Sequence, residues 1–338
     1  MHNSLQKFLF LGVIIAVIAF SGAAHPSFFV SGDAATTGTN NTSSRPANDP
    51  PILILPSLSA DIGAQVSAAS NPSAVSHINA DAATSVAPFV RVGNAAEPDL
   101  GAAAALVADL KTGAPFLAVN ADERWPMASV SKLMTAVVAT DLLGLNQRIT
   151  ITETMTAVDP SEQILHVGDT YTVADLLRVM LLPSNNVAAE SLAEFAGRAQ
   201  FLAAMNAKAH AWGMANTYYD DPSGLSAANE STANDLLKLA QQIYANYPQV
   251  LAITRMPQAT ANDLSTGQAV TVKSINNFAG QADFIGGKTG YTDQADGNLL
   301  SIFSYEGRPI FVVILGVDND VRFNATQELY NWFKANFK

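Results

Sequence analysis

Residues 126–135 read Pro-Met-Ala-Ser-Val-Ser-Lys-Leu-Met-Thr, and this stretch predicts a helix that begins near a serine. Ser129 and Lys132 are three residues apart, so on a helix their side chains share one face, with about 5–6 Å between the Cβ atoms. A serine hydroxyl is a weak nucleophile until a base takes its proton. Lys132 can be that base only when neutral, which burial or a second cation favours. Alone, the pattern is more often a helix cap beside an exposed lysine.

The second motif is Ser-Asn-Asn at residues 184–186, at the start of a further helical pattern. Ser and Asn are both favoured at helix N-caps, so the triplet alone is an ordinary cap. If the Ser-Asn-Asn triplet lies beside an activated serine, its side chains can take part in the reaction. We expect Ser184 to pass a proton from Lys132 towards a leaving amine, and Asn186 to hydrogen-bond a substrate amide.

The third motif, Lys-Thr-Gly at residues 288–290, ends a strand pattern that contains two further glycines. Glycine on a strand allows a substrate or another backbone to approach closely. We therefore expect Lys288 and Thr289 to hold a substrate carboxylate, and Lys288 to be the second cation that lowers the pKa of Lys132. A copy of the triplet at 111–113 is interpreted as a hairpin tip.

The order of the motifs carries more information than any single one, because each has a second copy elsewhere in the chain. Only the set that begins at residues 129, 184 and 288 has the right order and plausible separations. This combination is typical of class A β-lactamases and penicillin-binding proteins.

The residues around the motifs resemble those of the low-molecular-mass penicillin-binding proteins, the serine-type D-alanyl-D-alanine carboxypeptidases. The resemblance covers about 98–338 and is carried by residues 128–135, 181–184 and 288–292, and by Asp-Pro-Ser-Gly-Leu at 221–225. It implies an α+β, β-lactamase-like fold, with a five-stranded antiparallel sheet beside a helical cluster. This region has strand patterns at both of its ends and helical patterns in its middle, which agrees with an α+β fold. We expect the sheet to combine strands from the two ends.

The resemblance also implies the chemistry. Ser129 would attack the penultimate carbonyl of a peptidoglycan stem peptide, D-Ala would leave, and water would release the acyl-enzyme. The backbone N–H groups of Ser129 and Tyr291 would form an oxyanion hole beside Gly290, and β-lactams would be covalent inhibitors. No metal or other cofactor is expected. One departure is that Asp296 separates Ala295 from Gly297, where the family commonly has Ala-Gly.

Three alternatives to a terminal carboxypeptidase stay open. One is a DD-endopeptidase that cleaves peptidoglycan cross-links. The second is a class A β-lactamase, which would need a glutamate on the middle loop for deacylation. No glutamate occurs between Glu194 and Glu230, where Asp220 and Asp221 stand instead. The third alternative is a non-catalytic protein that binds the cell wall or penicillin, against which an intact motif set argues.

The N-terminus indicates export. Lys7 precedes an apolar run at residues 8–20, followed by small residues up to Ala24. This predicts a secretory signal at 1–24, or an uncleaved anchor that attaches the chain to the membrane, because apolar residues resume at Phe28. Both place the remainder in the periplasm or cell envelope. Residues 25–97 are rich in Ala, Ser, Asn, Thr and Pro and are interpreted as a low-complexity spacer before the catalytic domain at 98–338.

The composition of the 338-residue chain argues against several kinds of partner and site. The net charge is −11, whereas phosphate binding needs a basic surface, so nucleic acid is not an expected partner. The absence of cysteine excludes disulfides, thiolate metal sites and a cysteine nucleophile. A hydrophobic content of 49% is enough for a sizeable core.

Overall fold

The computed structural model describes residues 88–161 and 164–338. The predicted signal or anchor at 1–24 and the spacer up to residue 87 lie outside these residues. Within the described part of the chain, no helix is long and apolar enough to cross a membrane.

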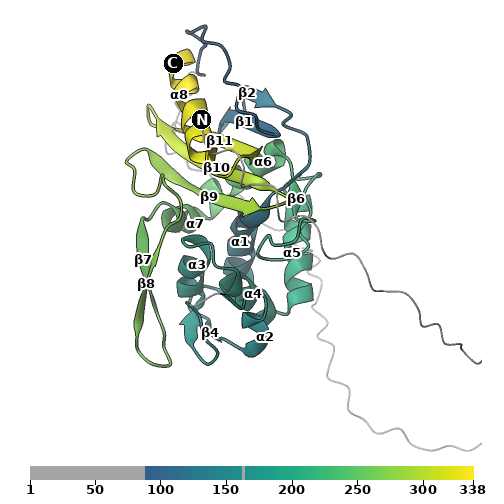
Figure 1. Ribbon diagram of the computed structural model, residues 1–338, viewed down its shortest axis with the longest axis vertical. Coiled ribbons are helices and arrows are strands. Elements are labelled where there is room, and N and C mark those ends of the chain that lie inside the picture. Colours follow the sequence, from purple (N-terminus) through teal and green to yellow (C-terminus); the bar gives the residue numbers. More distant parts are fainter. Residues whose placement is uncertain (1–87, 162–163) are drawn as a thin grey trace, which may run out of the picture. The chain divides into compact units, whose positions relative to one another are not determined.

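A five-stranded sheet forms the centre of the fold, in the order β2-β1-β11-β10-β9, and each neighbouring pair is antiparallel (Figure 1). The first two strands come from the start of the domain and the other three from its end, as the sequence predicted. The strands are β1 (Ala104–Asp109), β2 (Pro115–Val119), β9 (Phe284–Thr292), β10 (Asp296–Tyr305) and β11 (Arg308–Val317). The predicted α+β fold class is confirmed.

Successive side chains of a strand point to opposite faces of the sheet, and here each face packs into a core of its own. On β1, Leu106 packs into the larger core with the helical cluster, whereas Val107 packs into a second core under α8 (Arg322–Asn336). In that second core the ring of Tyr330 stacks on Phe303 with centroids 4.3 Å apart. Figure 1 shows α8 on one side of the sheet and the other helices on the opposite side.

The helical cluster begins with a 3₁₀ turn that leads into α1, and it forms the helical middle that the sequence predicted. Its elements are η1 (Ala128–Ser131), α1 (Lys132–Leu143), α2 (Glu153–Thr156), α3 (Val173–Leu181), α4 (Asn186–Phe195), α5 (Arg198–Ala211), α6 (Ala233–Asn246) and α7 (Pro248–Thr254).

Three two-stranded ribbons complete the described elements, and most of their strands were not predicted. They pair β3 (Trp125–Pro126) with β6 (Glu230–Ser231), β4 (Arg148–Thr150) with β5 (Thr170–Thr172), and β7 (Gln258–Asn262) with β8 (Ala269–Lys273). The β7–β8 pair forms a hairpin separate from the central sheet (Figure 1).

A segment at residues 88–95, which we call the N-terminal strap, lies against the end of the chain. Val90 and Lys338 exchange two backbone hydrogen bonds, with N···O distances of 2.8 and 3.1 Å. The ring of Phe89 packs edge-on against Phe333 at 5.3 Å between centroids and lies under the Arg308 guanidinium. The strap thus packs on the folded unit, although it precedes the domain boundary expected at 98.

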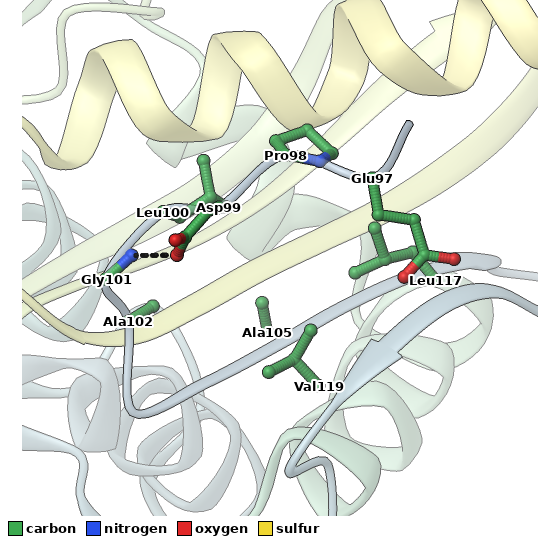
Figure 2. A pocket seen from close by; sticks show the side chains of 9 residues that line it. All are labelled: Glu97, Pro98, Asp99, Leu100, Gly101, Ala102, Ala105, Leu117 and Val119. Carbon is green, nitrogen blue, oxygen red and sulfur yellow. Dashed lines mark hydrogen bonds between the residues drawn. The ribbon is translucent and has the colours of Figure 1, made fainter. Parts of the chain in front are cut away.

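A cavity of about 270 Å³ lies where the chain leaves the strap and enters the sheet, and Figure 2 shows the side chains that line it. Residues 97–102 form one side, and Ala105, Leu117 and Val119 of strands β1 and β2 form the other. None of the predicted site residues lines this cavity.

Candidate active site

Ser129 and Lys132 lie together where η1 passes into α1. The Lys132 Nζ is 2.9 Å from the Ser129 Oγ, and it also contacts the Asn186 Oδ1 at 2.8 Å and the Ser223 carbonyl oxygen at 2.5 Å. Lys132 is completely buried, whereas Ser129 is only partly covered. A partly exposed hydroxyl against a buried amine is the arrangement that the first motif predicted.

Burial lowers the pKa of Lys132 to about 7, because an ammonium group loses its hydration there. The carboxylates of Asp221 and Asp159 act in the opposite direction and raise it. Burial, the first of the two causes that the sequence suggested, is thus the main one, rather than repulsion from Lys288. An amine with this pKa is available as a base near neutral pH.

The backbone around Ser129 is held in a strained conformation. Ala128 has φ +48°, a region that residues with a Cβ rarely adopt. Its carbonyl oxygen accepts a hydrogen bond from the Ser131 Oγ at 2.8 Å, and Ser131 in turn accepts from the Asn229 Nδ2 at 2.9 Å. Gly224 packs directly on this carbonyl, since a Cβ there would lie 1.9 Å from the oxygen. The surrounding contacts therefore fix the position of the nucleophile.

The loop at 221–226 is organised by one buried carboxylate. Asp221 accepts hydrogen bonds from the Ser223 and Gly224 backbone N–H groups at 2.6 and 2.5 Å, and from the Ser226 N–H at 2.5 Å. These bonds hold the Ser223 carbonyl against Lys132. Because this carboxylate is engaged by the loop itself, it is poorly placed to replace the glutamate of a class A β-lactamase.

Ser184 lies just before α4 and has φ +67°. Its Oγ accepts a hydrogen bond from the Lys288 Nζ at 2.8 Å, which joins the second and third motifs. The N-cap of α4 is Asn185, whose side chain accepts from the Ala188 N–H at 2.7 Å. The cap and the candidate proton relay are therefore neighbouring residues and not the same one.

The amide of Asn186 is engaged at both ends. Its Oδ1 accepts from Lys132, and its Nδ2 donates to the Asp159 Oδ2 at 3.0 Å. An asparagine amide has two N–H groups and two lone pairs, so one of each remains for the substrate amide that the sequence predicted. Asp159 is a contact that the sequence did not suggest.

Strand β9 brings the third motif alongside the nucleophile. Lys288 is 2% exposed, and burial together with the positive charges of Lys132 and Arg322 lowers its pKa well below the ordinary value. Gly290 allows this close approach, because a Cβ there would lie 2.7 Å from the Met127 carbonyl oxygen. Tyr291, the next residue, is 48% exposed.

Arg322, at the start of α8, is a further cation that the sequence did not predict. Its guanidinium donates to the Gly290 carbonyl at 3.3 Å and to the Asn319 side chain. Its contact with the Gly290 carbonyl puts a cationic side chain beside β9, where the substrate carboxylate was expected.

The copy of Lys-Thr-Gly at 111–113 is the hairpin tip that the sequence predicted. The Lys111 and Thr112 N–H groups both donate to the Asp109 Oδ1 at 2.9 Å, and Gly113 has φ +75°. Asp296, the departure from the family pattern, also has a local place in the sheet. It adopts φ +50° and pairs with Thr292, and the register between β9 and β10 is unbroken from this pair to Ile302 opposite Gly286.

No group of three or more histidine, aspartate or glutamate side chains within the described ranges is arranged to hold a metal ion. The site is formed instead by the three motifs, which lie far apart in the sequence and meet here.

Comparison with known proteins agrees with this arrangement. A family model described as D-alanyl-D-alanine carboxypeptidase matches residues 91–319. The chain belongs to this family. It is similar to a D-alanyl-D-alanine endopeptidase of Pseudomonas aeruginosa, with 35% identity over 69% of this chain and 77% of the relative. A D-alanyl-D-alanine carboxypeptidase of Escherichia coli is 28% identical over 70% of this chain and 62% of that relative.

Solved structures show the same likeness. A penicillin-binding protein homolog from Mycobacterium tuberculosis superposes with a TM-score of 0.67 and 29% identity, covering 72% of this chain and 95% of that one. A Listeria monocytogenes penicillin-binding protein, solved with bound ampicillin, superposes with a TM-score of 0.59 and 28% identity, covering 69% of this chain and 98% of that one. The chain is thus a serine DD-peptidase, as the motifs predicted.

Proposed function

We propose that this DD-peptidase removes the terminal D-Ala from peptidoglycan stem peptides through an acyl-enzyme on Ser129. The observation that carries the proposal is the 2.9 Å contact between Ser129 and a buried lysine whose pKa is about 7. The neutral amine of Lys132 takes the hydroxyl proton while the oxygen attacks the penultimate carbonyl carbon. A carbon–oxygen bond forms, and the carbonyl oxygen becomes negatively charged.

The backbone N–H groups of Ser129 and Tyr291 are the proposed donors to that oxyanion. The close packing of Gly290 on η1 supports this assignment, because it brings the end of β9 to the amide of Ser129. Donors fixed in advance by the fold stabilise charge that develops in the transition state.

The next step breaks the carbon–nitrogen bond, so the leaving amine needs a proton. Ser184 is the proposed relay that passes the proton taken by Lys132 to this amine, and the hydrogen bond from Lys288 holds its Oγ in place. Lys288, Thr289 and Arg322 supply the positive charge and hydrogen-bond donors that would hold the carboxylate of the terminal residue. Water then hydrolyses the ester, with Lys132 again taking a proton, and Ser129 is regenerated.

Cleavage of cross-links is a second candidate function. Two similar curated proteins are D-alanyl-D-alanine endopeptidases, at 35% and 31% identity. The two activities use the same acyl-enzyme and differ in the amine that leaves. Defined muropeptides separate them: a pentapeptide monomer releases D-Ala under the first activity, and a cross-linked dimer releases two monomers under the second.

The working location that we propose is the periplasm or another part of the cell envelope. Support comes from Lys7 and the apolar residues 8–20, and from the peptidoglycan substrate itself. Both a cleaved signal and a retained anchor agree with this location.

The nucleophile is tested by labelling with a fluorescent penicillin, followed by mass spectrometry of tryptic peptides. Ser129→Ala should abolish the adduct without unfolding the protein, and Lys132→Ala should slow acylation by about 10²–10⁴-fold. Lys111→Ala, in the copy of the third motif, is the control and should label normally. An adduct on a peptide without Ser129 would refute the assignment.

A further inference from the structure

Asp159, which follows α2, reaches the catalytic motifs from outside all three of them. Its Oδ2 accepts from the Asn186 Nδ2 at 3.0 Å, and its Oδ1 accepts from the Ser161 Oγ at 2.6 Å. Asn186 in turn accepts from Lys132 at 2.8 Å. A carboxylate is thus linked to the buried amine through a single amide.

This link determines which way the Asn186 amide points. An ionised carboxylate only accepts hydrogen bonds, so it selects the Nδ2 side of the amide. The Oδ1 side must then face Lys132, which donates to it. If the amide turned over, its oxygen would oppose the Asp159 carboxylate and its N–H groups would oppose Lys132. Both contacts would be lost together.

The charges around Lys132 come from three elements. Asp221 lies on the loop after α5, Asp159 lies after α2, and Lys288 lies on β9. The other groups within hydrogen-bond reach of Lys132, the Ser129 hydroxyl, the Asn186 amide and the Ser223 carbonyl, are neutral. Hydrogen bonds from Ser161 and Asn186 lower the pKa of Asp159, so it stays negatively charged at neutral pH.

We propose that Asp159 is a positioning residue for the catalytic lysine, because its carboxylate fixes the Asn186 amide with Oδ1 towards the Lys132 Nζ. This inference rests on the function proposed above. The negative charge of Asp159 has a second effect, because it raises the pKa of Lys132 and partly offsets the effect of burial. Loss of the carboxylate should therefore change both the rate of acylation and its dependence on pH.

The test is Asp159→Asn in the full chain, with acylation by a fluorescent penicillin measured from pH 5 to 9. An asparagine can donate as well as accept, so the Asn186 amide is no longer held in one orientation. We expect the plateau rate to fall by about tenfold, the usual effect of losing a hydrogen bond to a charged group. The midpoint of the acidic limb should move to lower pH, because a negative charge near Lys132 is gone.

Asp122→Asn is the matched control. The exposed Asp122 also accepts from an asparagine, Asn234 Nδ2, at 2.7 Å, so the same chemical change is made outside the site. Its plateau and midpoint should equal those of the wild-type protein. A merely structural role for Asp159 would lower the melting temperature without moving the midpoint.

Asp159→Glu keeps the charge on a longer side chain and serves if Asp159→Asn does not fold. We expect a lower plateau with the wild-type midpoint. An unchanged plateau in either folded variant would overturn the inference while leaving the proposed function intact, provided that Ser129→Ala is inactive. Labelling of Ser129→Ala would refute the function itself.

Discussion

Gly224→Ala tests whether the loop at 221–226 fixes the nucleophile. An added Cβ would lie 1.9 Å from the Ala128 carbonyl oxygen, whereas real Cβ contacts almost never fall below 3.0 Å. The loop and the turn before Ser129 must therefore separate by about 1 Å. Such a displacement of a reacting group can cost about 10²-fold in rate, which is the loss of acylation that we expect.

Backbone strain adds a separate effect on stability, and a control isolates it. Gly224 has φ +85°, where a residue with a Cβ costs about 1–2 kcal/mol. Gly197 has the same φ, and a Cβ there would meet nothing within 4 Å. Gly197→Ala should thus lose a similar amount of stability from strain and keep its acylation rate.

The assay is the second-order rate constant for a fluorescent penicillin, measured beside thermal unfolding of both variants. Folded Gly224→Ala should acylate about 100 times more slowly than Gly197→Ala. If the two folded variants acylate at rates within threefold of each other, the reasoning about the loop is wrong.

Three further results are expected. Below pH about 7 the Lys132 amine is protonated, so wild-type acylation should fall towards tenfold per pH unit; a flat rate from pH 5 to 8 would contradict this. Phe89→Ala should lower the melting temperature by about 4–8 °C, since the ring contributes about 2 kcal/mol; an unchanged value would remove the strap from the folded unit. Penicillin should give one equivalent of adduct and then slow release, because the Asp221 carboxylate is engaged by its own loop, and rapid repeated turnover would indicate a β-lactamase.

The strands of the central sheet were predictable because they are long and apolar, or end in a recognisable motif. The ribbons containing β3 to β6 were not, because strands of two or three residues show no periodicity. Their pairing depends on partners far along the chain, such as Trp125 with Ser231.

The catalytic motifs were predictable because their residue types and spacing are unusual together. The 3₁₀ turn under Ser129 was not, since the positive φ of Ala128 occurs where the distant Gly224 packs on its carbonyl, and no local pattern marks that contact. Asp159 and Arg322 were also missed. Each touches its partner across about 30 residues of sequence, and no local pattern marks such a contact.

The pairing of Val90 with Lys338 brings the strap at 88–95 beside residue 338, so the folded unit is almost a closed ring. A short linker from 338 to 88 would close that ring, and new ends could be opened at the exposed β7–β8 tip, where Gly267 has open space around it. In such a permuted chain the Lys-Thr-Gly motif would precede the Ser-x-x-Lys motif, with every catalytic contact kept. The motif order that identifies this family in a sequence therefore depends on where the chain ends lie in the fold. The catalytic geometry does not depend on that order.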